Sequence, residues 1–169
     1  AAWPCRLSEV MKVDVVNRQR QARIDGGRVK ELVRWFMTRG GIPGRPCPWE
    51  AITVILADDA GIHRFNASFL KHDYPTDVIA FTYAPVPGTE TVTLGDIVVN
   101  VERAARVGDR YGGAERELAL YLAHGCDHLR GADDANPAQR RRMRARECRW
   151  LRACAANGML RGLISGTPR

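Results

Sequence analysis

Segments with the two-residue periodicity of strands alternate with segments of helical periodicity along most of this 169-residue chain. The expected strands are 12–16, 51–57, 77–83 and 94–101. The expected helices are 25–39, a short one ending at 69, 102–108, 114–129 and 137–157. Because sheets and amphipathic helices each bury one apolar side, this order predicts one mixed sheet with helices on its faces.

Capping residues and breakers mark the ends of these elements. Asp25 and either Asp58 or Asp59 are expected N-caps, and Asn136 is expected to cap the last helix, with Pro137 at its first position. Proline and glycine predict loops between the elements. These lie at 41–48, at Pro85, Pro87 and Gly88, and at Gly112–Gly113, Gly131 and Gly158.

The composition favours a single domain in a reducing compartment. A chain of this length with 45% hydrophobic residues can form one core. No apolar run approaches the roughly 20 residues that span a membrane, and no export signal opens the chain, so a cytoplasmic protein is expected. The cysteines are odd in number and form no CxxC pair, which favours buried thiols over disulfides. They are Cys5, Cys47, Cys126, Cys148 and Cys154.

A histidine pair at helical spacing is the densest chemical signal. His124 and His128 are four residues apart, so both imidazoles project from one side of the expected helix and can bind one metal ion. Gly131 ends the helix and lets Asp133 or Asp134 turn back as a third ligand. Three ligands leave open coordination positions, which is typical of a catalytic site.

This ligand set indicates hydrolysis. Zn²⁺ is the leading candidate, and Fe²⁺, Mn²⁺ or Ni²⁺ would also suit two imidazoles and a carboxylate. Such an ion activates water and polarises a carbonyl or phosphoryl oxygen. Gly125 stands where HExxH metalloproteases carry their glutamate base, so the usual protease mechanism is not expected.

Arginines on the last expected helix account for most of the net charge of +7. An arginine excess favours phosphate or carboxylate partners, although a solvated charged surface is the common alternative. Because this helix directly follows the histidines, its charge can attract a polyanion toward the metal. The arginines, opposed only by Glu147, are Arg140, Arg141, Arg142, Arg144, Arg146, Arg149 and Arg152. The apolar positions Met143, Trp150, Leu151 and Cys154 are expected to pack inward.

Three ordered motifs resemble the YbeY-type endoribonucleases, also called rRNA maturation factors. The segment 124–134, HGCDHLRGADD, is similar to the family's H-G-x-L-H-L-x-G-x-D-H. FNASFLKHDYPTDVIAF at 65–81 and LGDIVVNVERA at 94–104 are similar to two further family stretches, and an M-R-x-x-E pattern follows at 143–147. Three motifs in the correct order make the resemblance specific.

The resemblance implies a fold and a domain organisation. The fold is a single α+β domain with a small, mixed, mostly parallel four-stranded sheet packed with helices. The family-like domain is expected over 11–160, with 1–10 as an extension or cloning remnant and 161–169 as a tail.

The resemblance also implies an activity. It is metal-dependent cleavage of single-stranded RNA in 3′-end maturation of small-subunit (16S-type) rRNA and in ribosome quality control. Single-stranded RNA, rRNA, the small ribosomal subunit and its assembly factors are the expected partners, with no membrane. A metal-dependent hydrolase of another substrate and a non-catalytic ribosome-assembly factor with a structural metal remain the alternatives.

The same resemblance implies the site. His124, His128 and Asp134 would hold one Zn²⁺ whose activated water performs the catalysis. Arg140, Arg141, Arg144, Asp73 and Thr76 would contact RNA; Asp73 and Thr76 fit equally well as turn residues.

The sequence departs from the family pattern at three positions, and these affect which residue roles can be transferred to this chain. Asp134 replaces a histidine ligand, and Asp127 replaces an apolar residue, so its carboxylate is expected near the site or on the solvent side of the helix. Leu70 replaces an arginine found in many members, so a contact with substrate attributed to that arginine does not transfer.

Overall fold

The computed structural model describes residues 11–39, 49–83 and 93–166. Its elements, in order, are β1 (Lys12–Asn17), α1 (Gly26–Arg39), β2 (Trp49–Ala57), α2 (Asp59–Phe65), the π-helical turn η1 (Asn66–Leu70), β3 (Val78–Tyr83), β4 (Thr93–Asn100), α3 (Val101–Gly108), α4 (Ala114–Leu129) and α5 (Pro137–Ala156). The extension at 1–10, the loop at 41–48 and the break at Pro85, Pro87 and Gly88 lie outside the described residues.

The four strands form one mixed sheet in the order β1-β2-β4-β3. β1 pairs with β2 and β2 with β4 in parallel, whereas β3 joins the edge antiparallel to β4. The predicted α+β fold with a small, mostly parallel four-stranded sheet is therefore confirmed.

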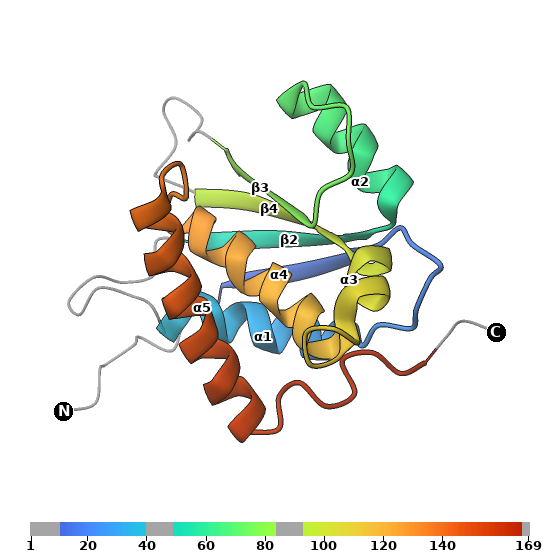
Figure 1. The fold of residues 1–169 in the computed structure, drawn as a ribbon, viewed down its shortest axis with the longest axis vertical. Coiled ribbons are helices and arrows are strands. Elements are labelled where there is room, and N and C mark those ends of the chain that lie inside the picture. The colour runs from blue at the N-terminus through green and yellow to red at the C-terminus, as the bar shows by residue number, and fades with distance from the viewer. Residues whose placement is uncertain (1–10, 40–48, 84–92, 167–169) are drawn as a thin grey trace.

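Helices cover the two faces of the sheet unequally (Figure 1). α1 and α4 lie on one face and enclose the main core, which includes Ile97 and Val99 of β4. The intervening Val98 points to the opposite face, where it joins a smaller cluster with Ile62 of α2. None of the described helices is long and apolar enough to cross a membrane.

The capping predictions at the helix starts are confirmed. The Asp58 side chain accepts a hydrogen bond from the Gly61 amide at 2.7 Å, and Asn136 forms a capping box with Gln139 at the start of α5. The helix expected to end at residue 69 instead changes to the π-helical turn at Asn66. The buried Asn66 side chain donates to the Tyr74 carbonyl at 2.7 Å, a contact that the local sequence pattern does not reveal.

Gly125 lets α4 approach the sheet closely. A Cβ atom there would lie 2.6 Å from Cγ2 of Ile97 and 3.2 Å from Cγ2 of Val78, distances too short for an unchanged packing. The residue after the first histidine therefore faces the sheet and not the histidine ligands. This explains structurally why no glutamate base stands at this position.

The segment expected as a tail packs against the body over its described part. Leu163 is fully buried, and the amide of Asp25 donates to its carbonyl at 3.0 Å. Ile164 forms an isolated antiparallel bridge with Ile24. The core thus extends beyond residue 160, because Leu163 supplies an apolar side chain next to the start of α1.

Candidate metal centre and adjoining cleft

One turn of α4 brings two imidazole nitrogens together. Nε2 of His124 lies 3.0 Å from Nε2 of His128, and the two rings are nearly perpendicular, at 88°. An oxygen of Asp134, from the turn after Gly131, lies 3.9 Å from Nε2 of His124. The ligand atoms of these three residues all lie within 4.8 Å of one another, and all three side chains are partly exposed.

The hydrogen-bond partners of the two Nδ1 atoms determine which nitrogen of each histidine carries the proton. Nδ1 of His124 lies 2.6 Å from Oε1 of Glu147, and Nδ1 of His128 lies 3.1 Å from the Ala132 carbonyl. A carboxylate and a carbonyl can only accept, so each Nδ1 carries the proton and donates it. In the neutral rings both Nε2 lone pairs then face the same point and repel each other. A cation bound between them would remove this repulsion.

Glu147 is the strongest electrostatic partner in the site. Its side chain is only 3% exposed and lies against His124. Burial by itself would lower the pKa of His124, but the hydrogen bond and the charge of Glu147 outweigh it, and the pKa is raised. A carboxylate on Nδ1 is the usual outer partner of a metal-binding histidine, because it orients the ring and makes Nε2 a better donor.

The two neighbouring aspartates have different roles. Oδ1 of Asp133 accepts from the amides of Asp134 and Ala135, at 2.8 and 3.2 Å, so this carboxylate stabilises the turn. Asp134 is the member of the pair that joins the histidine cluster. The geometry therefore separates the two candidates for third ligand that the sequence left open.

The donor set fits Zn²⁺. Zinc binds imidazole nitrogen at about 2.0–2.1 Å, which places two ligands of a tetrahedron about 3.3 Å apart. The two Nε2 atoms are 3.0 Å apart, and Nε2 of His124 is 3.9 Å from Oδ2 of Asp134, so the observed separations lie on either side of this value. Two imidazoles and one carboxylate supply three ligands and leave a position for water or substrate.

A cleft of about 500 Å³ extends from these residues along α4. Glu117, Tyr121 and His124 line it from three successive turns of α4. Their spacing is i, i+4 and i+7, so they share one side of the helix. Burial raises the pKa of Tyr121, and the neighbouring charge of Glu117 adds to the effect.

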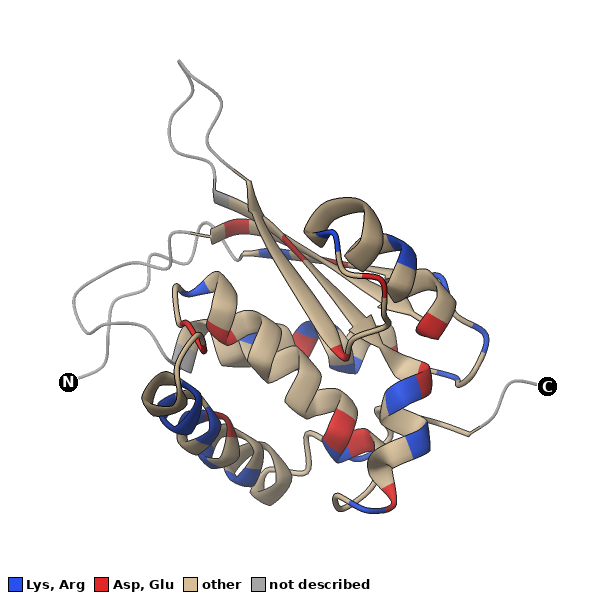
Figure 2. Ribbon diagram, turned by 45° about the horizontal axis from the view of Figure 1, so that its top comes forward, with Lys and Arg blue, Asp and Glu red and all other residues tan. Residues whose placement is uncertain are grey.

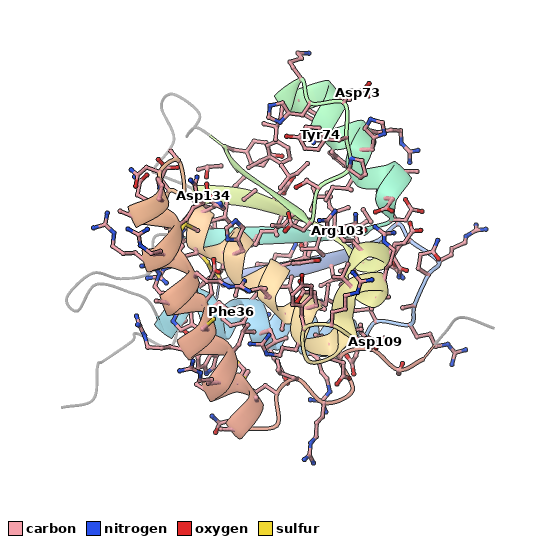
Figure 3. The ribbon with its side chains drawn as sticks, in the orientation of Figure 1. Phe36, Asp73, Tyr74, Arg103, Asp109 and Asp134 are labelled. Carbon is pink, nitrogen blue, oxygen red and sulfur yellow. The ribbon has the colours of Figure 1, made fainter. Side chains whose placement is uncertain are left out.

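Arginines from two flanking helices line the cleft. Figure 2 shows blue residues on α3 and on α5, the helices on either side of α4. α3 supplies Arg103, and α5 supplies Arg140 and Arg144. Figure 3 shows Asp134 near the C-terminal end of α4 and Arg103 toward the opposite end of the cleft. The cleft therefore joins a candidate metal site to side chains that favour phosphate groups.

The remaining sequence-predicted contacts lie outside the cleft lining. Arg141 is exposed on α5, and Thr76 donates to Asp77, whose side chain does line the cleft. Asp73 is paired with His63 at 2.8 Å and lies on the far side of the molecule from α5 (Figure 3). A role for Arg141, Asp73 or Thr76 in RNA binding stays a prediction.

The expectation that Asp127 lies on the solvent side of the helix is wrong, and the candidate metal cluster does not include this residue. Its side chain is 3% exposed, and Oδ2 lies 2.6 Å from a guanidinium nitrogen of Arg146. Asp127 therefore neither joins the metal cluster nor faces solvent. It pairs α4 with α5, because the residue before a ligand histidine on this helix points toward the neighbouring helix.

Several cleft residues do not stand out in the sequence. Glu147 is predicted there only as the acid that opposes the arginines and as the end of the M-R-x-x-E pattern, and no role is predicted for Arg103, Tyr111, Glu117 or Tyr121. A signal was present for two of them, since Glu117 and Tyr121 precede His124 by seven and three residues on the same side of a helix. Arg103 and Glu147 fall within the family-like stretches at 94–104 and 143–147, but no periodicity marks them as cleft residues, because both reach the cleft through helix packing.

Fold and site together define a small α+β domain with a candidate three-ligand metal site beside an arginine-lined cleft. Comparison with known families places this domain more closely. The family model described as Endoribonuclease YbeY matches residues 14–155. The chain belongs to the YbeY endoribonuclease family.

Individual relatives agree with this assignment. An Endoribonuclease YbeY from Elusimicrobium minutum is 43% identical over 94 residues, covering 54% of this chain and 66% of that protein. One from Geobacter metallireducens is 32% identical and covers 81% of this chain and 91% of the relative. One from Chlorobium phaeovibrioides is 33% identical, and the match covers 86% of this chain and 93% of the relative.

A solved structure shares the fold. The solution structure of TM1509 from Thermotoga maritima superposes with a TM-score of 0.53, covering 87% of this chain and 94% of that one. The two sequences are 19% identical, so this likeness supports the fold alone.

Proposed function

We propose that the protein is a metal-dependent endoribonuclease that cleaves single-stranded RNA. The observation that carries this proposal is the convergence of His124, His128 and Asp134 at one end of an arginine-lined cleft. Family membership supplies the RNA substrate, since the matched relatives are named endoribonucleases. We also propose that it acts in the cytoplasm in 3′-end processing of small-subunit rRNA and in ribosome quality control, with the small subunit and its assembly factors as partners; the resemblance to the family supports this role.

Each group in the site has a part in this hydrolysis. A bound Zn²⁺ would supply an activated water and polarise a phosphoryl oxygen. Glu147 holds the proton on Nδ1 of His124, which keeps Nε2 free for the metal. Arg140 and Arg144 would neutralise the phosphates of the strand.

The reaction itself is a simple hydrolysis. The water oxygen forms a bond to phosphorus, and the bond from phosphorus to one ribose oxygen breaks. One product keeps the phosphate as a monoester and the other ends in a hydroxyl group. The protons of the water are divided between this hydroxyl and the solvent.

The test compares RNA cleavage by the intact, chelator-treated and zinc-restored protein. We expect endonucleolytic cleavage of single-stranded RNA that chelation abolishes and Zn²⁺ restores, and no cleavage by His124→Ala. Full activity without metal would contradict the proposal. Metal binding without any turnover would favour a ribosome-assembly factor with a structural ion, and turnover of a non-nucleic substrate alone would favour another hydrolase.

A second variant examines the third ligand. Asp134→His introduces the ligand that is commoner in the family, so we expect it to retain bound metal. Loss of the metal from this variant would mean that the geometry here requires a carboxylate.

A further inference from the structure

We propose that the end of the cleft remote from the histidines is a guanine-binding subsite, with the carboxylate of Glu117 as the acceptor that selects the base. This inference rests on the proposed function, because the guanine belongs to the RNA strand that occupies the cleft. The residues of this proposed subsite are Glu117 on α4, Arg103 on α3 and Tyr111 in the turn after α3.

The position of Glu117 fits a base next to the reacting phosphate. Glu117 and His124 line the same cleft and are seven residues apart on α4. At 1.5 Å per residue this separation is about 10 Å along the helix axis. A strand whose phosphate lies at His124 can therefore reach Glu117 with a neighbouring base.

Glu117 is a buried carboxylate acceptor in the cleft. The residue is only 7% exposed and yet lines the cleft. It takes part in none of the ion pairs found among the described residues. Tyr121 can satisfy one of its lone pairs, which leaves further acceptor capacity on the two carboxylate oxygens. A buried carboxylate is stabilised by hydrogen-bond donors. A ligand that brings two N–H groups could therefore bind to Glu117.

Guanine is the base that offers such a pair of donors. Its N1–H and N2–H₂ groups are adjacent and point the same way, so they can meet both oxygens of one carboxylate. Adenine and cytosine place a lone pair beside their amino group, which a carboxylate repels. Uracil presents a single N–H between two carbonyl oxygens.

The other two residues suit the rest of the nucleotide. Tyr111 is 55% exposed at the edge of the cleft, and an exposed tyrosine ring is a stacking surface for an unpaired base. Arg103 is partly exposed and offers a planar set of donors to a phosphate.

The test measures cleavage of single-stranded oligonucleotides that differ at one position only. Guanine, inosine, adenine, cytosine or uracil is placed in turn at each site around the cut. We expect wild-type kcat/KM to be about tenfold higher for guanine than for inosine at one fixed position, since inosine lacks the N2 amino group. Glu117→Gln should remove this difference, read as the ratio of kcat/KM for guanine to kcat/KM for inosine within the variant. Glu31→Gln, at an exposed residue of α1, is the matched control.

Two further measurements keep the test decisive. If Glu117→Gln fails to fold, Tyr111→Ala should weaken the preference at the same position and Tyr111→Phe should keep it, because the ring is retained. Oligonucleotide binding by fluorescence anisotropy, without turnover, reports base preference independently of cleavage. A guanine preference in binding without any cleavage would contradict the proposed function alone. Cleavage without a guanine preference, or with one that Glu117→Gln leaves intact, would overturn the subsite.

Discussion

The protonation of two imidazole rings decides what the site can bind. Glu147 and the Ala132 carbonyl each accept a hydrogen bond from the Nδ1–H of one histidine, so both Nε2 lone pairs are left to bind a metal. The ligand residues alone do not produce this state, since a neutral histidine can carry its proton on either nitrogen. The capacity of the two histidines to bind a metal therefore depends on residues outside the candidate ligand set.

Glu147→Gln tests this dependence. The amide keeps the shape of the side chain but loses the charge, so we expect zinc affinity to fall about 10–100-fold with the fold retained. Competition with a colorimetric chelator measures the affinity, and circular dichroism checks the fold. Glu31→Gln is the control and should bind zinc as the wild type does. An unchanged affinity in Glu147→Gln would show that the hydrogen bond to His124 has no influence on the metal.

Gly125→Ala tests the close packing of α4 on the sheet. The added Cβ meets Cγ2 of Ile97 at 2.6 Å, so we expect a loss of about 1–3 kcal/mol in the free energy of unfolding, measured in urea. Gly26→Ala in α1 is the matched control, because its nearest neighbours are 3.9 Å away. Equal stability of Gly125→Ala and the wild type would mean that the helix and the sheet can move apart freely.

The candidate ligand cluster was predictable from the sequence, whereas the residues that hydrogen-bond or pack around it were not. The His124–His128 spacing marks a shared helix side wherever the helix is placed. Glu147 and Asp127 take their roles from the packing of α4 against α5, and this packing has no local signature. Asp127 illustrates the limit, since a carboxylate between two ligands on a helix was expected near the metal or in solvent and instead pairs with Arg146.

At the scale of elements, α4 and α5 act as one unit that carries the site. α4 supplies both histidines, and α5 supplies Glu147 and the cleft arginines. The buried pair of Asp127 with Arg146 joins the same two helices. The relative placement of the two helices sets the distance between Glu147 and His124. A substitution that shifts one helix against the other should therefore change the affinity of the candidate site for a metal.

A double-mutant cycle measures this coupling. Asp127→Leu leaves the Arg146 guanidinium without its partner, and we expect a loss of about 1–3 kcal/mol in stability. Adding Arg146→Met removes the unpaired charge and should recover at least half of that loss, because an apolar pair of similar size can replace a buried ion pair. Thermal and urea unfolding supply the values. Strictly additive losses would contradict a direct interaction.

Element boundaries were predictable where a side chain caps the backbone locally. Asn136, Pro137 and Gln139 form the start of α5 within four residues, and that start was predicted correctly. The change to a π-helical turn at Asn66 was not predictable, since it accompanies a hydrogen bond to Tyr74, eight residues further along. Such contacts depend on how the chain returns to the sheet.

At the scale of the whole molecule, the net charge of +7 is unevenly distributed. α5 carries arginines at the cleft, Arg140 and Arg144, and others that are exposed but do not line it (Figure 2). We call Arg142, Arg149 and Arg152 the outer arginines. All three are exposed, and they extend the positive surface beyond the cleft.

The outer arginines should add affinity for long RNA only. Each phosphate contact to a single strand contributes about 0.7 to the slope of log K against log salt concentration. The triple change Arg142→Gln, Arg149→Gln and Arg152→Gln should therefore lower that slope by about 2 for a long RNA and leave a short oligonucleotide unaffected. The corresponding triple lysine variant is the control for charge. Identical slopes for the glutamine variant and the wild type on long RNA would exclude these arginines from binding.

We propose that one ion at His124, His128 and Asp134 is required for RNA cleavage. The most direct measurement titrates metal-free protein with Zn²⁺ and records bound metal and the rate of single-stranded RNA cleavage on the same samples. We expect both quantities to rise together and to saturate at one ion per chain, and we expect His124→Ala to show neither. Cleavage at the full rate in the metal-free protein, or saturation of the site without any cleavage, would contradict it.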